Sequence, residues 1–220
     1  MDLICHGVPS PQLFREYIAW LEEKNASQIK FYDFRDKRGG WGLAFKYVSK
    51  EHKYFKPCSI DPYYSYFLEG YTYRECCYKC RYCRPERTGD ITIGDFWGIE
   101  NEHPDFYSIK GVSCMLINTN KGLVTWRKYR YLYHSIESTF EKVSRENSNL
   151  LHPTERKNAI RDHIYDGIGT KDWFANVFAS SFKPSNKSKI KAQIPIKFRF
   201  WMKWLLELIR FRSMRLHMRI

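Results

Sequence analysis

Residues 74–100 read RECCYKCRYCRPERTGDITIGDFWGIE, which places four of the chain's seven cysteines within eight positions, directly before a run typical of a buried strand. Cys77, Cys80 and Cys83 form C-x-x-C-x-x-C, the start of a bacterial ferredoxin cluster-binding sequence. That sequence would continue with a cysteine four positions on, where this chain has Arg87. A four-cysteine iron–sulfur site would therefore need a ligand from elsewhere in the chain.

Zinc is an alternative occupant of the same cysteines, although the chain has no second C-x-x-C pair of the kind that structural zinc sites use. Cys5 and Cys58 are the remote candidates for a further ligand. Cys76 is predicted not to be a ligand, because successive residues seldom point into one site. Cys114 lies in an apolar run, where we expect a small buried hydrophobe.

The composition indicates a globular protein of a reducing compartment. The chain has 220 residues, of which 43% are apolar and 17% aromatic, enough to build a core. It has no run of about 18 apolar residues that could span a bilayer. The start, MDLICHGVPSP, lacks the basic and apolar regions of a signal peptide. The expected location is therefore cytoplasmic. In such a reducing compartment, clustered cysteines of odd number are expected to be metal ligands or redox groups more often than disulfides.

Around the cysteines, the hydrophobic pattern alternates between helix and strand. The segment SPQLFREYIAWLEEKN predicts an amphipathic helix capped by Ser10, and residues 29–34 and 43–48 predict two strands joined by a turn at Gly39 and Gly40. Further on we expect a short helix in PYYSYFLEGY, strands in DITIGDF and GVSCMLINT, and a helix in KGLVTWRKYRYLY. The predicted fold class is α/β or α+β, with a mixed sheet and flanking helices.

The net charge of +13 is concentrated at the carboxyl terminus. Residues 183–220 contain eleven Lys or Arg and one acidic residue, which leaves only +3 for the rest of the chain. We expect a domain at 1–179, a linker at 180–195 and a basic amphipathic helix at 196–220. Its interleaved aromatic residues favour an anionic membrane surface over nucleic acid, with peripheral attachment at the inner face of the membrane. The alternative is a solvated helix packed on its own domain.

Five segments in this order resemble the C-terminal part of the coenzyme F420 hydrogenase/dehydrogenase beta-subunit family. They are DLICHGVPSPQLFREYIAWLE, FYDFRDKRGGWG, CCYKCRYCRPERTGDITIGDFWGIE, KGVSCMLINTNKG and NSNLLHPTERKNAIRDHIY. The resemblance implies iron–sulfur clusters, a flavin, and electron transfer between a reduced carrier and a partner. It also implies a link to polysaccharide biosynthesis, because some members lie among bacterial surface-polysaccharide genes.

The resemblance further implies that ferredoxin-like segments would precede Met1, so we expect a C-terminal portion that works with such a segment or with a redox partner protein. A 4Fe-4S cluster of the family type would use Cys5, Cys77 and Cys80 with a cysteine from the absent region. Otherwise Cys83 or a water would complete the site. Cys77 and Cys80 rank above Cys83, whose position varies in the family.

Two further segments are candidates for binding the flavin, expected to be FAD. In GDFWG, the glycines Gly94 and Gly98 would let backbone approach a cofactor, while Asp95 and Trp97 could hydrogen-bond to it or stack on it. The alternative is a tight turn with a core tryptophan. In FRDKRGGWG, the side chains of Arg35 and Lys37 suit a cofactor phosphate, and the alternative is an ordinary basic hairpin turn.

Together these features predict an iron–sulfur and flavin oxidoreductase subunit or fragment. The alternatives are a zinc-stabilised binding module with a basic tail and a cofactor-free remnant. No G-x-S-x-G, Walker loop, G-x-G-x-x-G or H-E-x-x-H sequence occurs, so hydrolase, nucleotide-triphosphatase and zincin functions have no support.

Overall fold

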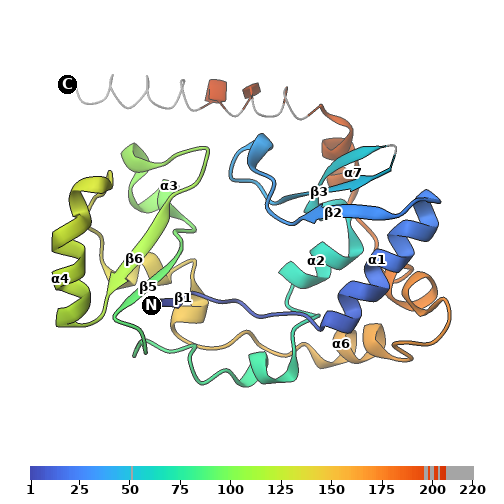
Figure 1. The fold of residues 1–220 in the computed structure, drawn as a ribbon, viewed down its shortest axis with the longest axis horizontal. Coiled ribbons are helices and arrows are strands. Elements are labelled where there is room, and N and C mark those ends of the chain that lie inside the picture. Colours follow the sequence, from blue (N-terminus) through green and yellow to red (C-terminus); the bar gives the residue numbers. More distant parts are fainter. Residues whose placement is uncertain (51, 196–197, 199–200, 203, 207–220) are drawn as a thin grey trace. The chain divides into compact units, whose positions relative to one another are not determined.

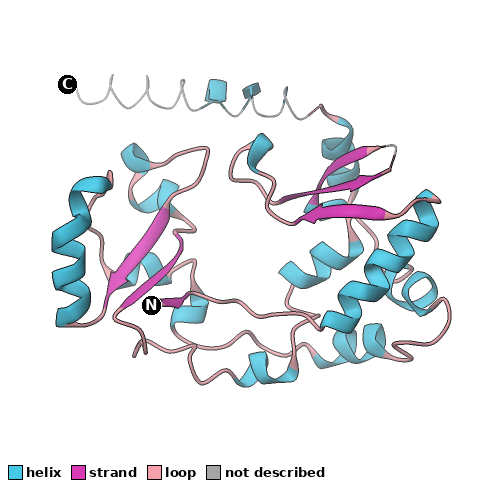
Figure 2. Ribbon diagram, viewed as in Figure 1, coloured by secondary structure: helices cyan, strands magenta, loops and turns pink. Residues whose placement is uncertain are grey.

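The computed structural model describes residues 1–50, 52–195, 198, 201–202 and 204–206. Its contacts divide the chain into two compact units. Unit 1 consists of Met1–Gly7 and Glu75–Glu155, and unit 2 consists of Val8–Arg74 and Arg156–Ile220. Each unit combines one small sheet with several helices, which confirms the predicted fold class (Figures 1 and 2).

Unit 1 is built on a mixed three-stranded sheet of order β1-β5-β6. The central strand β5 (Ile91–Asp95) runs antiparallel to β6 (Ser113–Ile117) and parallel to β1 (Asp2–Leu3). The two longer strands were predicted from their apolar runs. β1 was not, because a two-residue strand is defined only by its pairing with β5, about 90 positions further on along the chain.

Short helices follow the strands of unit 1. They are α3 (Ile99–Glu102), α4 (Asn120–Tyr129) and α5 (Phe140–Ser144), with 3-10 turns at Glu75–Lys79, Pro104–Phe106, Arg130–Leu132 and Ser148–Leu150. The Thr119 hydroxyl caps α4 by accepting a hydrogen bond from the Gly122 amide, as expected for a helix that starts after a strand.

Unit 2 contains an antiparallel sheet of β2 (Ile29–Asp33), β3 (Ala44–Ser49) and β4 (Lys53–Pro57). The predicted helix is α1 (Pro11–Asn25), and the Ser10 hydroxyl accepts from the Gln12 amide at its start. Between β2 and β3 lies a 3-10 turn, Lys37–Gly39. The predicted pair of strands and the glycine-rich connection are therefore confirmed.

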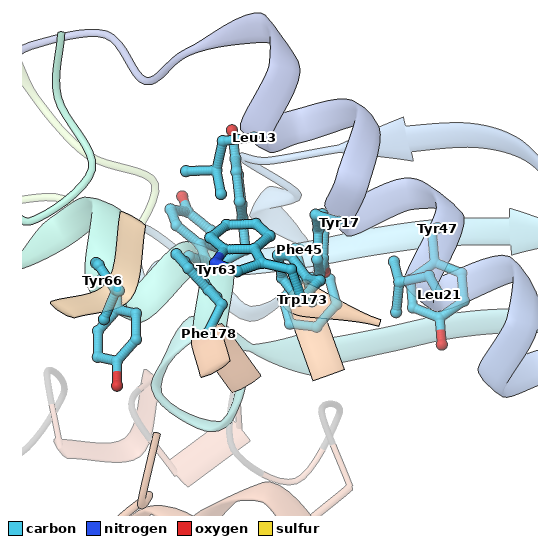
Figure 3. Packing of buried hydrophobic residues seen from close by; sticks show 12 residues of the cluster. Leu13, Tyr17, Leu21, Phe45, Tyr47, Tyr63, Tyr66, Trp173 and Phe178 are labelled. Carbon is cyan, nitrogen blue, oxygen red and sulfur yellow. The ribbon is translucent and has the colours of Figure 1, made fainter. Parts of the chain in front are cut away.

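An aromatic core holds unit 2 together (Figure 3). Around it lie α2 (Pro62–Leu68), α6 (Asn158–Tyr165), a π-helix (Phe174–Ala179) and α7 (Asn186–Gln193), besides a 3-10 turn at Cys58–Ile60. Tyr17 of α1 stacks on Tyr63 of α2 with ring centroids 4.7 Å apart. Its hydroxyl donates to the buried carboxylate of Asp61, which also caps α2. This core joins the two segments of unit 2, which lie more than 80 positions apart in the sequence.

Most of the predicted basic tail at 196–220 lies outside the described residues. Of the described part, Phe198, Trp201 and Trp204 are exposed. Helix α7 lies within the segment predicted as a linker, and the predicted domain bounds stay a prediction. No helix among the described residues is long and apolar enough to cross a membrane.

Candidate functional site

The clustered cysteines of unit 1 lie on consecutive tight turns, which we call the cysteine loop, residues 76–84. After the 3-10 turn at Glu75–Lys79, the Cys80 amide donates to the Cys77 carbonyl at 3.3 Å, and the Cys83 amide donates to the Cys80 carbonyl at 3.2 Å. The three-residue spacing therefore repeats as a backbone pattern. This winding is local, and it places the three cysteines at successive turns of the loop.

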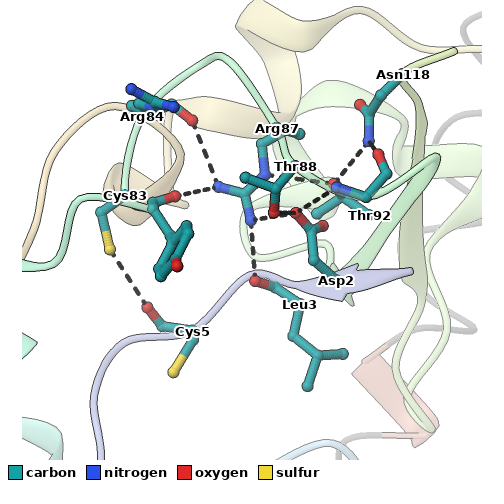
Figure 4. Close-up of polar contacts among 11 residues, drawn as sticks. Asp2, Leu3, Cys5, Cys83, Arg84, Arg87, Thr88, Thr92 and Asn118 are labelled. Carbon is teal, nitrogen blue, oxygen red and sulfur yellow. Dashed lines mark hydrogen bonds and ion pairs between the residues drawn. The ribbon is translucent and has the colours of Figure 1, made fainter.

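The structure brings Cys5 to this loop. The Cys83 thiol contacts the Cys5 carbonyl oxygen at 3.9 Å, although 78 positions separate the two residues (Figure 4). Burial raises the pKa of Cys83 to about 11, and the nearby Cys80 and Cys5 act in the same direction. Cys5 and Cys80 are thus both neighbours of Cys83, and we call these three residues the thiol site.

Asn149 and Thr154 lie beside the thiol site and form hydrogen bonds there. Neither was predicted from the sequence. The buried Asn149 amide donates to the Cys83 sulfur at 3.9 Å and to the Thr154 hydroxyl at 3.2 Å. Thr154 in turn donates to the His6 carbonyl at 3.2 Å. Desolvation lowers the pKa of His6, while its hydrogen bond with Asn149 and the charge of Asp95 oppose that shift. The segment NSNLLHPTE thus supplies the hydrogen-bond donors of the site.

Arg87 is the third residue that the sequence did not assign. Its position was noted only because a ferredoxin would have cysteine there. In the structure, its side chain is 4% exposed and lies between the cysteine loop and β1 (Figure 4). The only signal in the sequence is an arginine at the position where the ligand pattern stops.

The remaining cysteines have other surroundings. Cys76 is exposed, whereas Cys77 is half-buried within the cysteine loop. Cys58 belongs to unit 2, where burial raises its pKa to about 11. Cys114 is buried in β6 and its thiol donates to the Gly94 carbonyl at 3.5 Å, as expected for a small core residue.

The chemistry of the thiol site suits a soft metal centre, because thiolates select zinc and iron–sulfur clusters over hard cations. The Cys83 thiol contacts the backbone of Cys5, Cys77 and Cys80 lie on the same loop as Cys83, and the Asn149 amide faces the Cys83 sulfur. The residue types therefore fit both predicted metal centres. Within the described ranges, no group of three or more His, Cys, Asp or Glu side chains is already arranged to hold a metal ion, so the fit rests on residue type and proximity.

The predicted flavin segment, Gly94 to Gly98, lies at the end of β5 in the same unit. Gly94 and Asp95 are the last two residues of β5, and Gly98 adopts a positive φ of 79° at the start of α3. Trp97 is half-buried, while the side chain of Phe96, between Asp95 and Trp97 in the sequence, is buried. The Ile4 amide donates to the Ile93 carbonyl at 2.9 Å, and a Cβ added at Gly94 would lie 2.8 Å from the Ile4 side chain, so the start of the flavin segment packs against the residue before Cys5.

Arg35 and Lys37 of the predicted phosphate site belong to unit 2 and are exposed beside the 3-10 turn after β2. Between them, the buried carboxylate of Asp36 accepts from the Arg38 guanidinium at 2.9 Å. The Asp36 carboxylate also caps the turn through the Arg38 amide at 3.0 Å. The turn is therefore ordered by its own ion pair.

Comparison with known proteins identifies one family. A family model that describes the carboxyl terminus of the coenzyme F420 hydrogenase/dehydrogenase beta subunit matches residues 1–134. The matched region includes the whole cysteine loop, β1, β5 and β6. The comparisons with curated proteins and with solved structures gave no significant match.

Proposed function

The chain belongs to the coenzyme F420 hydrogenase/dehydrogenase beta-subunit family, matched through its C-terminal region, and on that premise we propose that it is an electron-transfer subunit whose thiol site holds an iron–sulfur cluster. The observation that carries this proposal is the contact of the Cys83 thiol with the Cys5 carbonyl, which brings the segment of Cys5 to the cysteine loop. Cys77, on the same loop, is the candidate for a fourth ligand. The cluster would supply the capacity to accept and release single electrons.

The surroundings of the thiols support this proposal. The Asn149 amide faces the Cys83 sulfur, and hydrogen bonds to cluster sulfurs are one of the means by which proteins set a reduction potential. The nearby Cys80 and Cys5 hold the Cys83 proton more firmly, because a thiolate there would add charge beside two other sulfurs. A cationic metal centre would reverse that effect by stabilising the thiolates.

We further propose that a flavin, FAD in the form that the resemblance implies, binds near Gly94, Asp95, Trp97 and Gly98. Its support is the packing of Gly94 against Ile4, the residue before Cys5, because a flavin beside that segment could exchange electrons with the cluster. Arg35 and Lys37 are proposed as contacts to a phosphate on unit 2, and their support is their exposed charge. The partner in electron transfer is proposed to be a redox protein or a ferredoxin-like segment.

Elemental analysis tests the cluster proposal. The full chain is reconstituted anaerobically with ferrous iron and sulfide, repurified, and analysed for iron, acid-labile sulfide and zinc. We expect iron and sulfide in similar amounts, with broad visible absorbance that is bleached by dithionite. Zinc without sulfide would favour the zinc-stabilised binding module, and a chain that retains neither metal would favour the cofactor-free remnant. Either result would overturn the proposal.

A membrane surface is proposed as a second partner through the carboxyl-terminal tail. The supporting observation is that Phe198, Trp201 and Trp204 expose about half of their surfaces in a segment rich in Lys and Arg. Aromatic side chains of this kind favour the interface between water and lipid, while basic side chains favour anionic headgroups.

A further inference from the structure

We propose that Arg87 is the positioning residue that assembles the thiol site by fastening the cysteine loop to the segment that carries Cys5. This inference rests on the proposed function, because it concerns the same thiols. It does not depend on which metal they bind. Arg87 stands where a ferredoxin sequence would have its next cysteine.

The hydrogen bonds of Arg87 reach three separate segments (Figure 4). On the cysteine loop, its Nη1 donates to the Tyr82 carbonyl at 2.7 Å and to the Arg84 carbonyl at 3.4 Å. On the amino-terminal segment, its Nη2 donates to the Leu3 carbonyl at 3.1 Å. Tyr82 directly precedes Cys83, and Leu3 lies two positions before Cys5. One guanidinium therefore fixes the backbone beside both cysteines.

The third segment anchors Arg87 to the sheet. Its Nε donates to the Thr92 hydroxyl of β5 at 3.3 Å, and its Nη2 lies 3.3 Å from the Asp2 carboxylate. Thr92 also accepts from the Asn118 amide at 2.9 Å, and both Asp2 and Thr92 belong to the paired strands β1 and β5. Because the contacts with Thr92 and Asp2 fix the guanidinium on the sheet, its hydrogen bonds to the Tyr82 and Arg84 carbonyls can fix the cysteine loop relative to the sheet.

Only arginine offers this set of donors. A guanidinium presents five N–H groups in a planar fork, whereas a lysine ammonium presents three donors around one point. The acceptors of Arg87 lie around the fork, with two loop carbonyls at Nη1, one amino-terminal carbonyl at Nη2 and a hydroxyl at Nε. A lysine at this position would keep the charge beside Asp2 and lose most of the bridge.

A second hydrogen bond holds the amino-terminal segment independently of Arg87, so the effect of Arg87 on the cysteine loop can be measured by itself. Thr154 donates to the His6 carbonyl, on the other side of Cys5 from Leu3. The amino-terminal segment therefore stays attached to unit 1 without Arg87. What Arg87 determines is how closely the cysteine loop lies to the segment that carries Cys5. We expect its removal to loosen the contact between Cys83 and Cys5 while leaving the turns within the cysteine loop intact.

Disulfide formation in the metal-free full chain measures this approach directly. In glutathione redox buffers, oxidised glutathione takes two electrons from a pair of thiols, which lose their protons and form a disulfide, and two molecules of reduced glutathione are released. Mass spectrometry of peptides then quantifies the Cys5–Cys83 disulfide against the Cys77–Cys80 disulfide, which forms within one turn and serves as the internal reference.

We expect Arg87→Gln to lower the effective concentration of Cys5 at Cys83 by about tenfold or more, with little change for the Cys77–Cys80 pair. Arg84→Gln is the matched control, because it removes an exposed arginine of the same loop and keeps the carbonyl that Arg87 uses. Circular dichroism checks the fold. If Arg87→Gln unfolds, Arg87→Lys carries the test, and it should reproduce the loss without unfolding.

Equal Cys5–Cys83 yields in the parent and in the folded Arg87 variant would overturn the proposal, as would an equal loss in Arg84→Gln. Because no metal is present, this result is independent of the cluster. Reconstitution could fail while the Arg87 effect is found, which would leave the positioning role intact and remove the iron–sulfur assignment.

Discussion

The Asn149 amide nitrogen lies 3.9 Å from the Cys83 sulfur, so a residue near the end of unit 1 faces the cysteine loop across 66 positions of sequence. Asn149 is buried and also donates to Thr154, which binds the segment of Cys5 and His6. The same side chain therefore contacts a candidate ligand and orders the backbone beside another. This arrangement is typical of the outer shell of metal sites.

Replacing Asn149 by alanine is expected to weaken metal retention. Outer-shell substitutions typically lower metal affinity by about 10–100-fold, because the ligand loses its orientation. The measurement is the iron retained by the reconstituted protein during dialysis against a chelator. Asn101→Ala is the control, since Asn101 is exposed in the same unit. Equal retention in the two variants would remove Asn149 from the site.

Cys83→Ser is expected to abolish most of the iron and sulfide bound on reconstitution, whereas Cys58→Ser is not. Cys83 contacts the segment of Cys5 and interacts electrostatically with Cys80, while Cys58 belongs to unit 2. Iron and acid-labile sulfide per chain are measured for both variants, with Cys76→Ser as a second control because Cys76 is an exposed neighbour. A Cys83→Ser protein that binds as much iron as the parent would show that another cysteine completes the site.

The sequence predicted those parts of the molecule whose cause is local. Helix α1 follows from its apolar period, its proline and the Ser10 cap, and strands β5 and β6 follow from short apolar runs. In each case, the residues that determine the structure are near neighbours in the chain.

The parts that the sequence did not predict depend on distant contacts. β1 has only two residues and exists because β5 pairs with it. Arg87 and Asn149 act through hydrogen bonds to carbonyls and to a sulfur, and carbonyl acceptors are the same in every residue. No residue pattern marks such acceptors, so the assembly of the site could not be derived from spacing.

Gly122→Ala is expected to destabilise unit 1 by about 1–3 kcal/mol, the usual cost of overpacking. A Cβ at this position would lie 2.3 Å from the Asp90 carbonyl oxygen, which is backbone and cannot turn away. Alanine is favoured over glycine within a helix by roughly 0.5–1 kcal/mol, so a net loss would show that the clash is the larger effect.

The free energy of unfolding in urea checks this expectation for Gly122→Ala. Val124→Ala is the control on the same helix, because Val124 is 65% exposed and its truncation leaves no cavity. A stabilised Gly122→Ala protein would mean that α4 can move away from Asp90 without cost.

Asp61 is expected to make unit 2 less stable as the pH rises from about 4 to about 6. Burial raises its pKa from the ordinary value of 3.8 to about 6, although hydrogen bonds from the Tyr64 amide and the Tyr17 hydroxyl oppose the shift. Between these values the folded state keeps a proton that the unfolded state has lost. The contribution of protonated Asp61 to the free energy of unfolding is thus fully present below pH 3.8. It is lost as the pH rises through 6, by about 1.4 kcal/mol per pH unit at most.

Asp61→Asn removes this titration. Its amide oxygen can replace Oδ1 and accept from the Tyr64 amide, while its NH2 group would face the Tyr17 hydroxyl, whose oxygen can accept. The difference in unfolding free energy between the variant and the parent should therefore increase in favour of the variant across that pH range, by roughly 2–3 kcal/mol in total. Urea unfolding at several pH values measures it. A difference that stays constant with pH would show that Asp61 does not change its charge there.

Binding to anionic vesicles is expected to require the carboxyl-terminal tail. Residues 196–220 contain seven Lys or Arg and one Glu, and each basic contact near an anionic surface contributes about 1 kcal/mol. A chain that ends at Pro195 keeps Phe182, whose ring packs against Tyr66 at 5.6 Å, so this truncation preserves the described core of unit 2. We expect the intact chain to co-sediment with vesicles containing phosphatidylserine at low salt and the shortened chain to stay largely in solution.

The apolar side chains of the tail are expected to contribute to this binding as well as its charge. The paired substitution Trp201→Ser and Trp204→Ser separates the two effects, because it keeps every basic residue and removes two exposed aromatic rings. Since burial of a large aromatic side chain contributes roughly 1.5–3 kcal/mol, the doubly substituted chain should bind markedly less. Undiminished binding of the doubly substituted chain would show that charge alone accounts for the attraction. If the intact chain does not bind the vesicles, the tail contacts protein instead.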